Sequence, residues 1–106
     1  MARTFNHPAA GDISLDSVLH ALSDPMRRHI VQKLMASDSM SCIQACATLP
    51  PSTISFHHKI LREAGLIRSE KKGVEVINTL RRTDIDERFP GLLDAVFPQK
   101  NPSPAS

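Results

Sequence analysis

The middle third of the chain constrains the fold more than any other part of the sequence. Pro50-Pro51 breaks the chain and can start a new helix, because proline is well tolerated in a first helical turn. Gly65 ends that helix, since a left-handed cap is easiest for glycine. Two extended runs, Leu66–Glu70 and Val74–Leu80, follow and are joined by a lysine-rich turn. This segment predicts a tight turn, a helix to Ala64 and a β-hairpin.

The helix after the proline turn has two different sides at 100° per residue. The inner side carries Ile54, His57, His58, Leu61 and Ala64. The outer side carries Ser52, Ser55, Phe56, Lys59, Arg62 and Glu63. Hydroxyls, a cation and an aromatic tip are the mixture that a face in the DNA major groove needs, although an ordinary amphipathic surface helix is the alternative. His58 is interpreted as a hydrogen-bonded, partly buried histidine and not as a ligand.

Capping signals place the other helices. Ser14 can cap a first helix, and Asp24-Pro25 begins a second. Ser41 opens a capping box for a short third helix that ends near Leu49. Thr83 caps the last helix, which is interrupted at Pro90. The expected fold is mainly α, a winged helix-turn-helix with about five helices and a two-stranded wing. Its domain covers 14–97, between flexible tails over 1–13 and 98–106.

Charge and composition reduce the number of functional classes to consider. The net charge is only +2, but 51–82 holds seven basic side chains against three acidic ones, which indicates an anionic partner or a face charged for solubility. No apolar run approaches a membrane span or a signal peptide, so a cytoplasmic protein is expected. The sequence shows no clear Ser/His/Asp catalytic arrangement and no clear pair of catalytic carboxylates. Its four glycines are few for a glycine-rich loop that binds phosphate. We therefore expect neither an enzyme nor a cofactor.

Three stretches of the sequence resemble the ArsR (arsenic-repressor type) family of winged helix-turn-helix regulators. They are Leu22-Ser23-Asp24-Pro25-Met26-Arg27-Arg28-His29-Ile30-Val31, the run from Ser52 to Ile67, and the run from Arg81 to Asp94. The resemblance covers about residues 14–97. It implies dimeric repressors that leave DNA when an effector binds or a thiol reacts. The chain departs from the family at Pro50-Pro51, where polar capping residues are usual, and at His58, where Leu or Phe is usual.

The function expected from these features is sequence-specific regulation of transcription, by a repressor that binds an inverted-repeat operator in double-stranded DNA as a homodimer. The predicted DNA contacts are Ser52, Thr53, Ser55, Phe56, Lys59 and Arg62 on the helix and Arg68, Lys71 and Lys72 on the wing. The predicted dimer interface comprises Leu15, Leu19, Phe89, Leu92, Leu93 and Val96. The alternative is a winged helix that binds protein or RNA without operator specificity.

The two cysteines have several possible roles, so the sequence does not determine which effector the protein responds to. Cys42 and Cys46 are four residues apart, so a helix would place both thiols on one face. They can be small buried apolar residues, a thiol switch for oxidants or electrophiles, or part of a metal site. Soft metal ions require three or four ligands, so a metal site needs another residue such as His29 or His7. No metal site is predicted.

Overall fold

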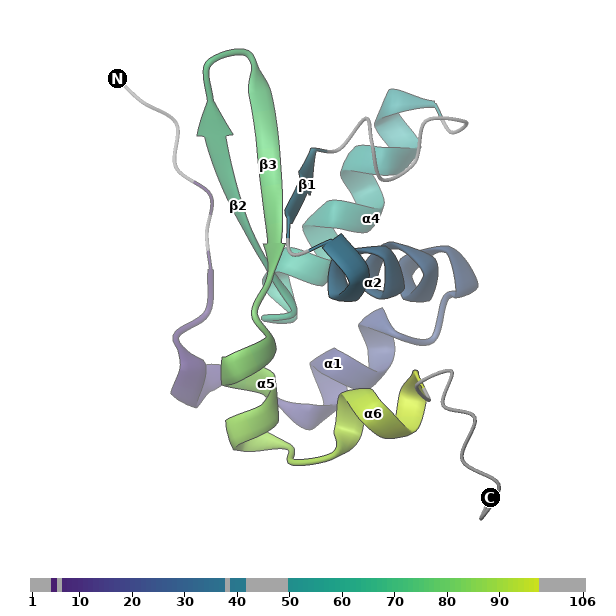
Figure 1. Cartoon of the computed structure of the whole chain (residues 1–106), viewed down its shortest axis with the longest axis vertical. Coiled ribbons are helices and arrows are strands. Elements are labelled where there is room, and N and C mark those ends of the chain that lie inside the picture. The colour runs from purple at the N-terminus through teal and green to yellow at the C-terminus, as the bar shows by residue number, and fades with distance from the viewer. Residues whose placement is uncertain (1–4, 6, 38, 42–49, 98–106) are drawn as a thin grey trace.

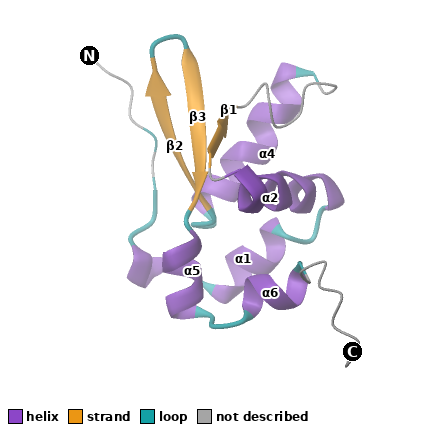
Figure 2. Ribbon diagram, in the orientation of Figure 1, coloured by secondary structure: helices purple, strands orange, loops and turns teal. Residues whose placement is uncertain are grey.

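The computed structural model of the chain describes residues 5, 7–37, 39–41 and 50–97. Helices and a small sheet alternate along the chain, and Figures 1 and 2 show the hairpin projecting from the helices. The expected winged helix-turn-helix is confirmed, with the hairpin as its wing. The elements are the 3₁₀ helix η1 Ala10–Asp12, helices α1 Leu15–Ala21 and α2 Pro25–Ser37, strand β1 Ser39–Ser41, helix α4 Pro51–Glu63, strands β2 Ile67–Lys72 and β3 Glu75–Leu80, and helices α5 Arg82–Arg88 and α6 Leu92–Val96.

The first two helices begin where their caps predict. The Ser14 hydroxyl accepts a hydrogen bond of 3.1 Å from the Ser17 N–H at the start of α1. At α2 the Asp24 carboxylate accepts from the backbone N–H groups of Met26 and Arg27, at 2.7 and 3.2 Å. Burial alone would raise the pKa of Asp24, but these two donors hold it below its usual value. Both starts are therefore fixed by local hydrogen bonds.

The sheet has a third strand that the sequence does not predict. Ser39–Ser41 forms β1 and pairs with β3, so the antiparallel order is β1-β3-β2. The sequence instead predicts that Ser41 caps the start of a helix at this point. Three residues are too few to show the alternation that marks a strand, and β1 is held by a partner far away in the sequence. The rest of the predicted third helix, 42–49, lies outside the described residues.

The wing turns tightly at its tip. Gly73 has φ of 64°, and the register pairs Lys72 with Glu75, which leaves two residues in the loop. A positive φ at the first loop residue is typical of hairpin turns whose twist matches that of the strands. Val74 is predicted in the second strand but occupies this loop and is 97% exposed. The hairpin therefore ends in an apolar side chain at its tip.

The C-terminal segment forms two short helices in place of one interrupted helix. α5 begins at Arg82 without a side-chain cap, so Thr83 lies inside its first turn and the predicted Thr83 cap is wrong. The Arg81 side chain instead donates to the Asp84 carboxylate at 3.0 Å and stabilises this end. Gly91, with φ of 83°, then precedes α6 and lets the chain change direction after Pro90.

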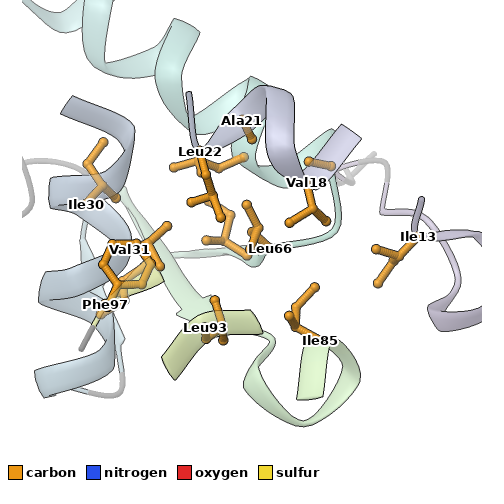
Figure 3. Packing of buried hydrophobic residues seen from close by; sticks show 14 of the residues in the cluster. Ile13, Val18, Ala21, Leu22, Ile30, Val31, Leu66, Ile85, Leu93 and Phe97 are labelled. Atoms are coloured by element: carbon orange, nitrogen blue, oxygen red, sulfur yellow. The ribbon is translucent and has the colours of Figure 1, made fainter. Parts of the chain in front are cut away.

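A single core joins the α-helices that the structure describes to the base of the wing. Figure 3 shows Val18, Leu66, Ile85 and Leu93 pointing toward one another from α1, the α4–β2 link, α5 and α6. Ile13 is buried in the same cluster although it lies in the segment expected to be a tail. We call residues 5 and 7–13 the N-terminal strap, because they contact the domain. The packing of the chain therefore includes residues before the predicted boundary at residue 14, and 98–106 lies outside the described residues.

Candidate nucleic-acid interface

Helix α4 is seated by its inner side, as predicted from the sequence. The Pro50 carbonyl accepts from the N–H groups of Thr53 and Ile54, at 3.0 and 3.1 Å, which starts the helix directly after the proline turn. Ile54, His57, His58, Leu61 and Ala64 are all buried. The helix packs on α1, α2 and β2, so its opposite side is held at the surface.

The exposed side of α4 carries four of the predicted DNA contacts. Ser52, Ser55, Phe56 and Lys59 are exposed, and we call them the reading face. Phe56 is one of the few large apolar side chains in the described residues that lie open to solvent. Its ring packs obliquely against the neighbouring His57 ring, with centroids 5.9 Å apart. The reading face therefore combines hydroxyls, a cation and an apolar tip, as the sequence indicates.

The wing tip and the beginning of α4 lie at the same end of the molecule. Figure 1 shows both at the top of the view, whereas α1, α5 and α6 lie at the bottom. Lys71 and Lys72 are exposed just before the tip. Arg68 is also exposed, but it faces Thr79 in the register near the base of the hairpin. The two lysines are therefore closer than Arg68 to the end that holds the start of the reading face.

Arg62 lies at the junction of helix and wing and is half-buried. Its guanidinium donates to the Ser69 hydroxyl at 3.2 Å and stacks over the Phe5 ring, 4.4 Å from the centroid. The helical wheel predicts it as a DNA contact. Phe5 precedes the first helix and Ser69 lies in β2, so a wheel of α4 could not reveal them. Thr53 is also only partly exposed, at the start of the helix.

A buried arginine locks α4 to the first two helices. Arg27 donates from Nε to the Ala21 carbonyl at 2.8 Å and from its guanidinium to His57 Nδ1 at 3.3 Å. Because an arginine only donates, His57 must accept at Nδ1. Arg27 is only 6% exposed, so nearly the whole side chain is buried. Its sequence signal is weak because its partners come from two different helices.

His58 is more deeply buried than expected. Its Nδ1 and the Ile54 carbonyl are 2.8 Å apart, so Nδ1–H donates along the helix. Nε2 is buried and has no hydrogen-bond partner among the described residues. Burial lowers the pKa of His58, and the nearby Arg62 and His57 lower it further, against the opposing effect of the Ile54 bond. The folded chain therefore favours the neutral ring.

Replacement of His58 by Leu is expected to stabilise the chain by about 1 kcal/mol near neutral pH, because it removes a buried unpaired nitrogen. The gain should grow as pH falls below about 6.5, by at most about 1.4 kcal/mol per pH unit. In that range the unfolded histidine binds a proton that the folded one resists. Urea unfolding at pH 7.5 and 5.5 measures both effects. His29→Gln, a change at an exposed histidine, is the control, and an equal pH dependence in wild type and His58→Leu would contradict this assignment.

The remaining residues considered in the sequence analysis are the two cysteines and the histidines that could complete a metal site. Cys42 and Cys46 lie outside the described residues. Among the residues that the structure does describe, no three His, Cys, Asp or Glu side chains are grouped to hold a metal ion. His7, considered above as a further ligand, uses its Nε2 to accept from the Ser69 N–H. The same residues include no helix long and apolar enough to span a membrane.

Comparison with known proteins agrees with this geometry. The sequence pattern of a helix-turn-helix domain family matches residues 22–70, from the end of α1 into the wing. The crystal structure of an ArsR family transcriptional regulator is similar with a TM-score of 0.61 and 20% identity, over 67% of this chain and 74% of that one. The transcriptional repressor PagR of Bacillus anthracis is similar with a TM-score of 0.55 and 23% identity, over 65% and 83%. No curated protein matches the sequence. At these identities the likeness establishes the fold.

Proposed function

We propose that this winged helix-turn-helix chain is a DNA-binding transcriptional regulator of the ArsR type, which represses transcription as a homodimer on an inverted-repeat operator. One observation carries the proposal. Figure 1 shows the start of α4, where the reading face begins, and the wing tip at one end of the molecule, and the two lysines stand at the end of β2 next to that tip. A helix for the major groove and a basic hairpin for the adjacent backbone are the two parts such a protein needs.

The two parts are assigned different tasks. Ser55 and Phe56 lie exposed on α4, where a hydroxyl can bond a base edge and a ring can pack on a thymine methyl. Lys59, on the same face, can reach guanine acceptors or a phosphate. Lys71 and Lys72 are flexible cations on the wing and are assigned to phosphates. Arg62 is assigned to the helix–wing junction.

The opposite end of the molecule is assigned to the dimer contact. Leu15 and Leu19 are 43% and 47% exposed on α1. Leu92 and Val96 of α6, and Phe89 just before it, are only partly buried against the core. A second copy would cover these side chains, and a two-fold dimer places two recognition helices on an inverted repeat. Leu93, also predicted there, is fully buried in its own chain and is removed from the proposed interface.

Substitutions in the two DNA-binding parts should have different effects. Ser55→Ala or Phe56→Ala should change which sequences are preferred and cost about 1–3 kcal/mol on the best site, if the side chain touches a base there. Lys72→Ala should weaken all sequences alike and reduce the salt slope by about one unit for each phosphate that the variant no longer neutralises. Titration of each variant on a selected duplex and on a scrambled duplex, over a series of salt concentrations, measures both quantities.

Lys33→Ala removes a positive charge from a partly exposed site on α2, outside both predicted DNA-binding parts, and is the matched control. It should leave the salt slope unchanged. Altered sequence preference in Lys72→Ala, together with unaltered preference in the Ser55 and Phe56 variants, would refute the assignment of reading helix and positioning wing. Wild-type protein that fails to bind any duplex would instead favour a protein-binding or RNA-binding module.

A further inference from the structure

The N-terminal strap lies along the free edge of the wing. β2 is an outer strand of the sheet, and the Ser69 N–H on that edge donates to His7 Nε2 at 2.9 Å. Figure 1 shows the described part of the strap on the β2 side of the sheet. The imidazole thus satisfies a backbone donor that a neighbouring strand would satisfy inside a sheet. The contact requires Nε2 to be unprotonated, because it accepts the hydrogen bond.

Ser69 connects three parts of the protein through a buried polar network. Ser69 and Asn78 are 3% and 1% exposed, and the Ser69 hydroxyl donates to Asn78 Oδ1 at 2.6 Å. The same hydroxyl accepts from the Arg62 guanidinium at the end of α4. Ser69 therefore connects both strands of the wing, helix α4 and the strap.

Two more contacts hold the strap near this network. The Pro8 carbonyl accepts from the Arg81 guanidinium at 2.8 Å, and the Phe5 ring lies under Arg62. Below them Ile13 anchors the strap in the core. The part of the strap around His7 therefore rests on a few polar contacts, while its other end is fixed by apolar packing.

We propose that His7 is a proton-sensitive latch, which holds the N-terminal strap on the helix–wing junction when its ring is neutral and releases the strap when its ring is protonated. Protonation places a hydrogen on Nε2, so the ring can no longer accept from Ser69. It also adds a positive charge to a place where arginines already gather. Both effects open the same contact.

The charges around His7 favour the neutral ring in the closed latch. Burial lowers the pKa of His7, and Arg68 of β2, Arg62 of α4 and Arg81 after β3 lower it further. Glu70 of β2 opposes them. Because the pKa is lower in the closed state than in the free strap, the latch has its full strength above about pH 6.5. It weakens as pH falls below that value, until the closed-state pKa is passed.

The latch is expected to affect DNA binding, a consequence that rests on the function proposed above. Ser69, the anchor of His7, also receives the hydrogen bond from Arg62. When the strap leaves, Phe5 is withdrawn from Arg62 and water reaches the network. The recognition helix and the wing are then held less firmly relative to each other. Affinity for a cognate duplex should therefore fall when the latch opens.

Amide hydrogen exchange at Ser69 tests the latch without DNA. We compare wild type, His7→Gln, whose amide oxygen can accept but does not titrate, and His7→Ala, which cannot accept. Below pH 6.5, protection of Ser69 in wild type should fall relative to His7→Gln, by at most about tenfold per pH unit, since one proton is linked. His7→Ala should be unprotected throughout. His29→Gln, a change at an exposed histidine of α2, should behave as wild type.

Equal pH dependence of Ser69 protection in wild type and His7→Gln would overturn the latch, as would full protection in His7→Ala. DNA titrations at pH 7.5 and 5.5 form the second arm. Wild type should lose several-fold more affinity than His7→Gln over this range. A protein that shows the Ser69 response but binds no duplex would refute the proposed function and leave the latch standing, so the two failures are distinguishable.

Discussion

Leu93→Asp is expected to leave the chain unfolded at room temperature. Leu93 is 0% exposed and packs in the core against Ile85 and Val18 from two other helices. A buried carboxylate without a partner costs several kcal/mol, and loss of the leucine packing adds about 2–5 kcal/mol. Natural domains are stable by only about 5–15 kcal/mol. Circular dichroism and urea titration would show a disordered chain or one with a strongly lowered midpoint.

Leu19→Asp is the variant that tests the proposed dimer separately from folding. Leu19 is 47% exposed on α1, so a carboxylate there keeps most of its water in a single subunit. The protomer should remain folded, with near-normal circular dichroism. In the proposed dimer the same carboxylate would be buried, so sedimentation at micromolar concentration should change from dimer to monomer. A wild-type protein that sediments as a monomer under these conditions would refute the dimer, and a cooperatively folded Leu93→Asp protein would refute the placement of Leu93.

Gly65→Ala should destabilise the chain by about 2–5 kcal/mol, through strain and overpacking together. Gly65 has φ of 90°, a conformation that other residues rarely adopt. An added Cβ would also lie 2.5 Å from Ile13 Cγ1 and 2.8 Å from Ile13 Cδ1. Ile13 is buried and cannot move aside freely. Urea unfolding gives the change in free energy, and the unfolding slope checks that the transition stays two-state.

Gly73→Ala separates the two causes. Gly73 also has a positive φ, but an added Cβ would meet nothing within 4 Å at the wing tip. Its cost should therefore be that of strain alone, about 1 kcal/mol. In the double variant Ile13→Val, Gly65→Ala, removal of a methyl group should partly relieve the clash and give less than additive destabilisation. Equal costs at Gly65 and Gly73 would show that the contact with Ile13 does not matter.

The sequence predicts those features that depend on neighbouring residues. Ser14 and Asp24 cap helices by bonds that reach two or three positions along the chain, and Gly65 ends α4 through its own backbone freedom. The division of α4 into an inner and an outer side is also local, since it requires only the helical period. These signals suffice for the fold class and for the reading face.

Features that depend on distant residues are not visible in the sequence or are misplaced by it. β1 is recognisable as a strand only through its pairing with β3. The place of Arg62 at the helix–wing junction is recognisable only through its contacts with Ser69 and Phe5. Leu93 and Leu19 both follow apolar spacing, so the sequence does not tell which of them the chain buries by itself. The strap resembles a tail because a histidine that accepts from a strand edge leaves no periodic pattern.

The order of the strands bears on how the protein folds as it is synthesised. β3 is the central strand of the three, yet it is the last of them to leave the ribosome. β1 and β2 therefore have no strand to pair with until residues 75–80 have been synthesised. α1 and α2 need only local contacts and can form early. Pairing of β1 with β3 then closes a long loop that contains the whole of α4. Closing this loop costs conformational entropy, and no earlier contact within the sheet has already reduced that cost. The proposed DNA-binding surface is therefore completed in one late step, when the wing forms.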